Sequence, residues 1–306
     1  MLFAGDISAG RTEWFWHFNQ LFFEFLESKK LNPKHIQPSG KNSSGYGVRN
    51  IFGHEVSFNL NNLLLANPKT EKCILFTTFF DLRQLRGGLN NIIDNIEAVY
   101  SGHYDRKIIE RDWPEIIPKI KPWYFRPWHS NFVYKENCYN PKNDNIYFRG
   151  LMIRGVRDLL DHLSKPNIKG IDIQSAKSKN YHQELTSSRL AFSMSGIRDM
   201  CNRDIEYWLT GMPFIRPRFT SKLLIDIPDD TYIPVDWEAN YNALTPIPKN
   251  VELLSEHIIE KYQSVKKDYN YLNKISRNGY NFYKSNFTMD LMIKNSFDLL
   301  LKSNMI

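Results

Sequence analysis

The chain has 306 residues, a length that suits two domains of about 100–200 residues each. Apolar residues make up 42% of the chain and aromatic residues 14%, which excludes a disordered protein. The net charge of +7 permits an anionic partner: nucleic acid, a membrane surface or a phosphate-bearing small ligand. The basic residues form no long block and several arginines adjoin glycines, which favours focused phosphate binding by those arginines.

The cysteines and the N-terminal segment indicate the cellular compartment in which the protein is expected. Cys73, Cys138 and Cys201 are far apart without metal-ligand spacing, so we expect free thiols in a reducing environment. The first residues lack the basic region of a signal peptide, and no stretch approaches the ~20 apolar residues of a membrane span. We therefore expect a soluble, cytoplasmic protein without a membrane span.

The first half of the chain predicts two strand–loop–helix units. Residues 1–5 are a short apolar run ending in glycine, and residues 12–30 predict a largely buried helix. Residues 72–82 predict a second strand, and the apolar spacing over 89–96 predicts a helix after it. The turn-rich segment 38–54 predicts a loop.

The proline-rich segment 114–141 predicts an irregular connection, after which the alternation restarts. The predicted strands are 145–150, 169–174, 189–194, 213–217 and 222–228. The predicted helices are 151–165, 203–211 and 288–303, with a short helix or turn at 180–188 and one or two helices over 251–284. Alternating strands and helices imply an α/β protein with two Rossmann-like domains of mostly parallel sheet, facing across a cleft. Ligands of such domains bind at the carboxyl ends of the strands.

The segment 193–217 is the most informative, because a strand there breaks at Ser195–Gly196 and a charged helix follows. Arg203 and Glu206 are three residues apart and share a helix face, and Arg198 precedes the helix. The opposite face carries apolar residues expected to pack on the sheet: Ile205, Trp208 and Leu209. Arginines bind phosphate in a bidentate manner and a carboxylate accepts ribose hydroxyls, so the layout suits a nucleoside diphosphate. The alternative is an Arg203–Glu206 surface ion pair, worth less than ~1 kcal/mol.

A second arginine cluster follows the strand 145–150. Arg149 ends this strand, and Arg154 and Arg157 lie in the first turns of the next predicted helix. Cations there oppose the helix dipole, which a bound anion would relieve. A solvated basic face is the alternative.

Two carboxylates of the first half follow apolar strands. Asp6 and Asp81 would face the cleft, where either could act as a general base on an acceptor hydroxyl. Asp6 could instead cap its helix, and Asp81 could pair with Arg83 or Arg86.

Several common site motifs are absent from the sequence. It contains no Walker pattern and no G-x-G-x-x-G after a strand, which disfavours a P-loop kinase and a standard NAD enzyme. No D-x-D ends a strand of the first domain, so no metal site is predicted. The aromatic segment 121–134 suits either stacking on sugars or bases, or packing at a domain seam.

The residues 145–290 resemble the C-terminal domain of GT-B glycosyltransferases, closest to the exostosin-like and protein O-glucosyl- and xylosyltransferase-like groups. The resemblance rests on the strand ending in Arg149–Gly150, on the arginines after it, and on the segment "EYWLTGMPFI" that begins at Glu206. The stretches "YIPVDWE" and "NGYNFYKSNFT" also resemble the ends of those domains.

This resemblance implies a function and a division of the chain. Arg149, Arg198 and Arg203 would hold the diphosphate of a UDP-sugar and Glu206 its ribose. The enzyme would need no metal or other cofactor, and would transfer xylose or glucose to a glycan hydroxyl, with inversion. Residues 1–135 would bind the acceptor, residues 136–285 would bind the donor, and residues 286–306 would form a helix packing back on the first domain. Some compact relatives that transfer xylose occur in large algal viruses.

Other functions stay open at this point. A pI of about 9.1 and the aromatic segment are compatible with a nucleic-acid-binding protein, although the scattered charges do not predict a nucleic-acid partner. A non-catalytic GT-B-like protein is a further alternative. A sulfotransferase would need a phosphate loop near the N-terminus, which "GDISAGRT" matches poorly. The sequence leaves the donor sugar, the acceptor and the oligomeric state undetermined.

Overall fold

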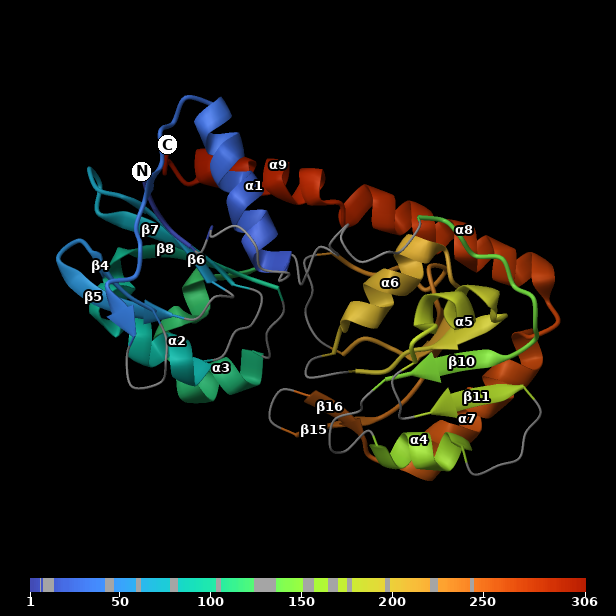
Figure 1. Ribbon diagram of the computed structural model, residues 1–306. Helices are drawn as coiled ribbons and strands as arrows, with labels where there is room; N and C mark the ends of the chain where they lie inside the picture. Colours follow the sequence, from blue (N-terminus) through green and yellow to red (C-terminus); the bar gives the residue numbers. More distant parts are fainter. Residues whose placement is uncertain are drawn as a thin grey trace. The chain divides into compact units, whose positions relative to one another are not determined.

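The computed structural model describes residues 1–5, 7, 14–41, 47–58, 62–77, 82–102, 106–123, 136–150, 157–164, 170–174, 178–195, 199–220, 225–242 and 245–306. The chain divides into two compact units (Figure 1). The first comprises Met1–Asn131, Ser221–Ile225 and Thr288–Ile306, and the second comprises Phe132–Thr220 and Asp226–Phe287.

The first unit is built on a six-stranded sheet in the order β2-β1-β6-β7-β8-β9. Its strands are β1 (Leu2–Ala4), β2 (Lys34–His35), β6 (Asn62–Asn67), β7 (Lys72–Thr77), β8 (Ile96–Ser101) and β9 (Ile120–Pro122). The sheet is mixed, because β6 runs antiparallel to both β1 and β7. A connection of only four residues separates β6 from β7, and such short links join antiparallel strands. The other five strands share one direction, so the prediction of a mostly parallel sheet is confirmed, with β6 as the exception.

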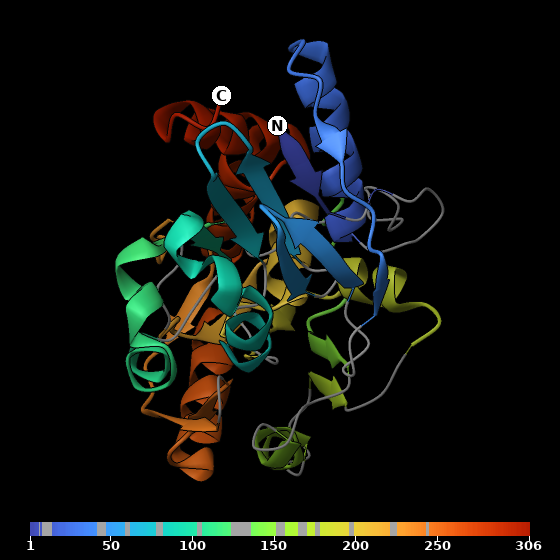
Figure 2. The ribbon, with the colours of Figure 1, turned by 90° about the vertical axis from the view of Figure 1, so that its left-hand side faces the viewer.

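Helices cover both faces of this sheet (Figure 2). They are α1 (Trp14–Ser28), α2 (Leu82–Leu89), α3 (Arg106–Asp112) and α9 (Met289–Lys302), with 3₁₀ turns at Asn90–Asn95 and Pro114–Lys119. Alternate residues of β7 serve the two faces. Leu75 packs in the core with Ile92 and Ile109, whereas Phe76 contacts Phe22 of α1.

The C-terminal helix α9 is part of the first unit. The indole of Trp123 donates to Ser296 Oγ at 3.2 Å, and the rings of Phe25 and Phe297 meet edge to face at 5.3 Å. The Asn67 amide also donates to the Met305 carbonyl at 3.3 Å. Contacts with the helix α1, with the loop after β9 and with the sheet hold this end of the chain.

Three sequence predictions in the first unit were wrong. The predicted loop 38–54 contains most of a small antiparallel sheet of β3 (Gly40–Lys41), β4 (Gly47–Ile51) and β5 (His54–Phe58). A two-residue turn, Phe52–Gly53, joins β4 to β5 with φ angles of 55° and 84°, as primed hairpin turns require. Ile96 starts strand β8 rather than ending a helix. Within the predicted irregular connection, residues 114–122 form the second 3₁₀ turn and β9.

The second unit contains a fully parallel sheet in the order β11-β10-β12-β13-β14. Its strands are β10 (Ile146–Arg149), β11 (Ile171–Gln174), β12 (Leu190–Phe192), β13 (Phe214–Pro217) and β14 (Ile233–Val235). Its helices are α4 (Arg157–Ser164), α5 (Tyr181–Ser187), α6 (Asn202–Thr210), α7 (Val251–Val265) and α8 (Tyr269–Asn286), and a hairpin forms from β15 (Ala239–Asn242) and β16 (Thr245–Pro248). The two units confirm the predicted α/β class.

The core of the second unit lies between the sheet and helices α4, α7 and α8, where Leu159, Ile258 and Ile275 are buried. Helix α6 ends at Gly211, whose φ of 73° provides the predicted glycine C-cap. One predicted strand was wrong: residues 225–228 are not extended in a sheet, and β14 lies further on. A turn intervenes, in which the Thr231 amide donates to the Pro228 carbonyl. No helix in the described part of the chain is long and apolar enough to span a bilayer.

Candidate nucleotide-binding site

The strand order of the second unit marks a position where a ligand would bind. The chain leaves β10 for its neighbour β11 on one side, and then returns to β12 on the other side. In doubly wound sheets, ligands bind outside the carboxyl ends of the strands at this reversal. The candidate site therefore lies where Arg149–Gly150 ends β10, where Ser193–Ser195 follows β12, and where α6 begins (Figure 1).

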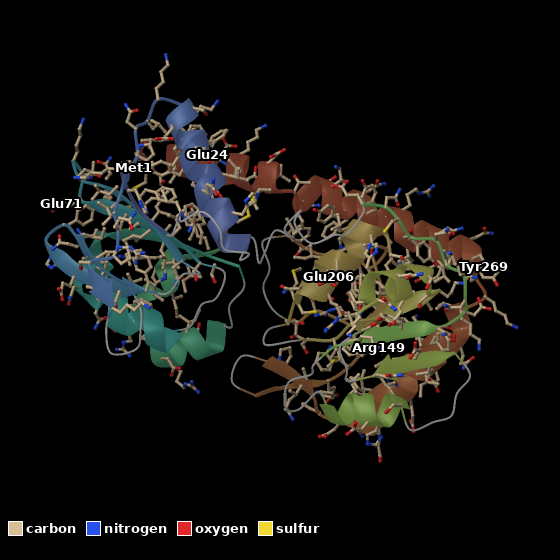
Figure 3. All side chains as sticks on the ribbon, viewed as in Figure 1. Met1, Glu24, Glu71, Arg149, Glu206 and Tyr269 are labelled. Atoms are coloured by element: carbon tan, nitrogen blue, oxygen red, sulfur yellow. The ribbon has the colours of Figure 1, made fainter. Side chains whose placement is uncertain are left out.

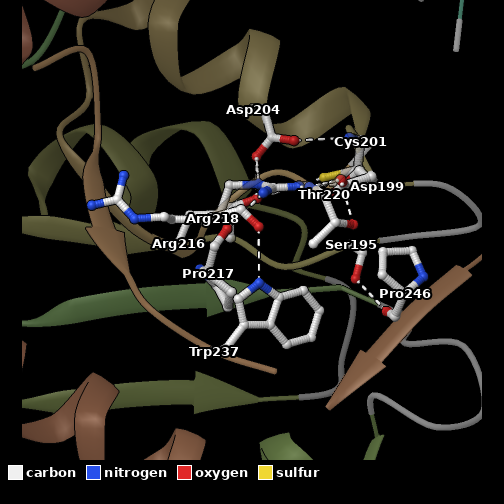
Figure 4. Close-up of polar contacts among 11 residues, drawn as sticks. Ser195, Asp199, Cys201, Asp204, Arg216, Pro217, Arg218, Thr220, Trp237 and Pro246 are labelled. Carbon is white, nitrogen blue, oxygen red and sulfur yellow. Dashed lines mark hydrogen bonds and ion pairs between the residues drawn. The ribbon is translucent and has the colours of Figure 1, made fainter. Parts of the chain in front are cut away.

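A buried ionic network fixes the start of α6 (Figure 4). Arg216 of β13 is 1% exposed, and its Nε donates to Asp204 Oδ1 at 3.1 Å while Nη2 bonds Asp199 Oδ1 at 2.9 Å. Asp204 also accepts the Ser193 hydroxyl at 2.5 Å and the Cys201 amide at 2.8 Å. Buried charges persist only when paired and fully hydrogen-bonded, so these contacts set the geometry of the segment after β12.

Sequence reasoning missed this network. Asp199 directly follows Arg198 and Asp204 directly follows Arg203, yet neither aspartate was assigned a role. One signal was available: Arg216 interrupts an otherwise apolar predicted strand, and an arginine in that position needs a buried carboxylate partner. Which carboxylate it meets depends on the tertiary fold.

Arg203 extends from α6 to the end of β10. Its guanidinium carbon lies 4.5 Å from the centre of the Phe148 ring. It also lies directly over Gly150, because a Cβ atom at that glycine would be 1.9 Å from Nη2. The guanidinium makes no hydrogen bond or ion pair with any other residue that the structure describes. Within the described residues, this partly buried cation has no hydrogen-bond acceptor, and it lies at the strand reversal, as an anion-binding group would.

Glu206 lies one turn further along α6 and is 7% exposed. The Tyr181 hydroxyl donates to its Oε2 at 2.9 Å. Burial raises the pKa of Glu206 to about 7, against the opposing effects of the Arg203 charge and the Tyr181 hydrogen bond. Since the carboxyl group is buried, the alternative of a solvent-exposed Arg203–Glu206 ion pair was wrong. Figure 3 marks Glu206 on α6 and Arg149 at the end of β10.

Arg149 is held mainly by its own protein. Its Nη2 bonds Asp172 Oδ1 at 2.6 Å, and its Nη1 donates to the carbonyls of Asp172 and Phe148 at 2.9 and 3.0 Å. The guanidinium also lies 4.8 Å from the ring centre of Tyr147. These contacts tie β10 to β11, and contact of Arg149 with a diphosphate stays a prediction.

Ser195 is also engaged within the protein. Its hydroxyl donates to the Pro246 carbonyl at 2.8 Å, which links the end of β12 to the β15–β16 hairpin (Figure 4). The predicted apolar face of α6 is confirmed, since Ile205, Trp208 and Leu209 are 0%, 0% and 5% exposed.

The remaining predicted site residues lie outside what the structure describes. This holds for Asp6, Asp81, Arg154, Gly196 and Arg198. Arg157 is the first residue of α4, and its side chain is likewise outside the described set. Their roles stay predictions.

The chemistry available at the site is electrostatic recognition. Arg203 supplies a positive charge with free donors in the described part of the site, and Glu206 supplies a carboxylate that can accept hydroxyl hydrogen bonds. Cys201 is no nucleophile, because burial raises the pKa of its thiol to about 11. Within the described ranges, no group of three or more His, Cys, Asp or Glu residues is arranged to hold a metal ion.

Comparison with known proteins gives similarities of fold. No protein-family model matches the sequence, and no curated protein matches it.

A glycosyltransferase from Rickettsia africae is 13% identical with a TM-score of 0.42, over 68% of this chain and 63% of its own. HepE of Anabaena, solved with UDP, is 12% identical with a TM-score of 0.47, over 73% of this chain and 68% of its own. The pneumococcal O-GlcNAc transferase GtfA, solved with UDP and GlcNAc, is 9% identical with a TM-score of 0.46, over 93% of this chain and 54% of its own. The chain thus spans less than two thirds of the length of the first and the third of these proteins.

Proposed function

We propose that the chain is a GT-B glycosyltransferase that takes its sugar from a UDP-sugar. One observation carries the proposal. At the strand reversal of the second unit, Arg203 lies on Phe148 and over Gly150, with no acceptor among the described residues and with the buried Glu206 one turn away. A cation with unused donors beside a buried carboxylate suits the diphosphate and ribose of a nucleotide.

Each group has a role in this proposal. Arg203 binds the diphosphate and stabilises the charge that develops on it as it leaves. Glu206 accepts hydrogen bonds from the ribose hydroxyls, and the Tyr181 hydroxyl holds the carboxylate in place. Arg149, Arg198 and Ser195 are proposed to line the diphosphate side. Arg154, Arg157 and Gly196 complete that proposed set.

The proposed reaction is a direct displacement with inversion and without a metal. A carboxylate, Asp81 or Asp6, removes the proton from an acceptor hydroxyl. The oxygen attacks the anomeric carbon and the nucleoside diphosphate leaves. Residues 136–285 would bind the donor and residues 1–135 a glycan acceptor, with xylose or glucose as the transferred sugar and the cytoplasm as the location.

Thermal melting in the presence of EDTA tests the donor site. UDP is expected to raise the melting temperature of the wild-type protein, and Glu206→Ala is expected to abolish the rise. Glu256→Ala is a matched control, because Glu256 is an exposed residue of α7. A hydrolysis screen over UDP- and GDP-sugars then identifies the donor.

Two outcomes would contradict the proposed function. If no nucleoside diphosphate stabilises the protein, the proposal is wrong. Oligonucleotide binding with a steep salt dependence, in the absence of donor hydrolysis, would support the nucleic-acid alternative instead.

A further inference from the structure

The second unit contains a pocket of about 510 Å³ that the donor site does not use. It lies past the carboxyl end of β14, between residues 236–238 and the start of α7. Its volume is within the range of about 300–1,000 Å³ that is usual for small-molecule sites. The residues that matter to its chemistry are Asp236, Trp237, Glu238, Lys249, Leu253 and Leu254.

The apolar part of the pocket is a fixed aromatic surface. The Trp237 indole donates to the Arg218 carbonyl at 2.8 Å, as Figure 4 shows, and the ring packs against the core of the unit. One side of the indole is therefore held by the protein, and the side chain lines the pocket. Leu253, on the facing helix, is 47% exposed, so an apolar group of the lining is left in contact with solvent.

The polar part of the pocket consists of carboxylates that are paired but exposed. Glu238 Oε2 bonds Lys249 Nζ at 3.0 Å, and the two side chains are 78% and 50% exposed. Asp236 pairs through Oδ1 with Arg218, and its side chain is 84% exposed. Each ion pair uses one carboxylate oxygen, and a carboxylate has about four acceptor positions, so acceptors stay available for a ligand.

The charged side chains of the lining are balanced in pairs. Asp236 is paired with Arg218 and Glu238 with Lys249, and His257 also lines the pocket. These pairs leave no uncompensated lysine or arginine among the described lining residues to bind a phosphate. The lining instead suits an uncharged molecule with one apolar ring face and several hydroxyl groups.

We propose that this pocket binds a saccharide, with a sugar ring stacked on Trp237 and with sugar hydroxyls donating to Asp236 and Glu238. Strand β14 is two places from β12 in the sheet, which corresponds to about 10 Å, and both strands end at the same edge. The saccharide would therefore lie along the edge that carries the donor site. Its assignment as part of a glycan acceptor rests on the proposed function, whereas saccharide binding itself does not.

Saturation-transfer NMR and calorimetry with xylobiose, cellobiose and maltotriose test the proposal. At least one of the three is expected to bind, and Trp237→Ala is expected to weaken binding by about tenfold. Because Trp237→Ala also removes a core contact, Glu238→Gln on an exposed side chain provides a second variant, expected to weaken binding about threefold without loss of stability. Glu256→Ala is the control, with unchanged binding expected.

Three results would overturn the proposal. They are no binding of any of the three saccharides, binding that both Trp237→Ala and Glu238→Gln leave unchanged, and displacement of the saccharide by UDP or inorganic phosphate. The donor proposal fails separately, because Glu206→Ala is expected to abolish UDP binding and leave saccharide binding intact. If the wild-type protein binds no saccharide but UDP still raises its melting temperature, the saccharide proposal fails and the donor proposal stands.

Discussion

Gly150→Ala should separate nucleotide binding from folding. The added methyl carbon would lie 1.9 Å from Nη2 and 2.8 Å from Cζ of Arg203, so the guanidinium must move away from the strand end. The φ angle of Gly150 is outside the left-handed region, so alanine fits the backbone. The clash involves only the far end of a flexible side chain, and the fold can absorb it.

The expected effects follow from the contacts of Arg203. Without ligand, the variant loses the contact between the guanidinium and the Phe148 ring, worth about 0.5–2 kcal/mol of unfolding free energy. With UDP, it loses the proposed charged hydrogen bond from Arg203 to phosphate, which would be worth about 1.5–3 kcal/mol. This corresponds to UDP affinity that is about 10- to 150-fold weaker.

Calorimetric titration with UDP and denaturant unfolding without it measure the two effects. Gly40→Ala is the matched control, since a Cβ atom there meets nothing within 4 Å. The double variant Gly150→Ala/Arg203→Ala should bind UDP no more weakly than Arg203→Ala, because both changes remove one contact. Wild-type UDP affinity in Gly150→Ala, or a further loss in the double variant, would refute the reasoning.

Three further predictions concern the surroundings of the site. Burial raises the pKa of Glu206 from 4.5 to about 7, so the folded state binds the proton more tightly than the unfolded state. As the pH rises from 4.5 to 7, the wild type should therefore lose about 3 kcal/mol of unfolding free energy relative to Glu206→Gln, as measured by urea unfolding. Parallel pH profiles of the two proteins would contradict this. Tyr181→Phe removes the donor to Glu206 and should move the pH midpoint of UDP binding upward, whereas Tyr147→Phe, whose hydroxyl bonds Glu184, should leave it in place. Arg216→Ala removes the cation that bonds two buried carboxylates and should cost about 3–5 kcal/mol in urea unfolding; a loss below about 1 kcal/mol would show that the network is not stabilising.

The parts of the fold that sequence patterns predicted are those with short apolar runs between helices. The strands β10, β12 and β13 are buried runs of three or four residues, and each is followed by a turn signal. The sheet β3-β4-β5 was missed because its strands are rich in glycine and polar residues. Its pairing comes from backbone hydrogen bonds and from a turn with positive φ angles, which composition does not reveal.

For the candidate site, the sequence predicted the residue types but not their surroundings. The spacing of Arg203 and Glu206 placed both on one helix face, and the structure shows them on α6. Their burial depends on residues far along the chain. Phe148 is brought under Arg203 by the parallel sheet, and Tyr181 reaches Glu206 from the preceding helix. Such contacts arise from topology, which local patterns do not encode.

The ion pairs of Arg216 have a consequence for the thermodynamics of binding. Asp199 precedes α6 and Asp204 lies in its first turn, and both are joined to β13 by one arginine. The first turn of α6, which carries Arg203, is thus ordered in the absence of any ligand. The proposed nucleotide would immobilise little additional backbone there, so most of its contact energy would be retained as affinity. Loosening this arginine would weaken binding through entropy while every ligand contact stayed chemically intact.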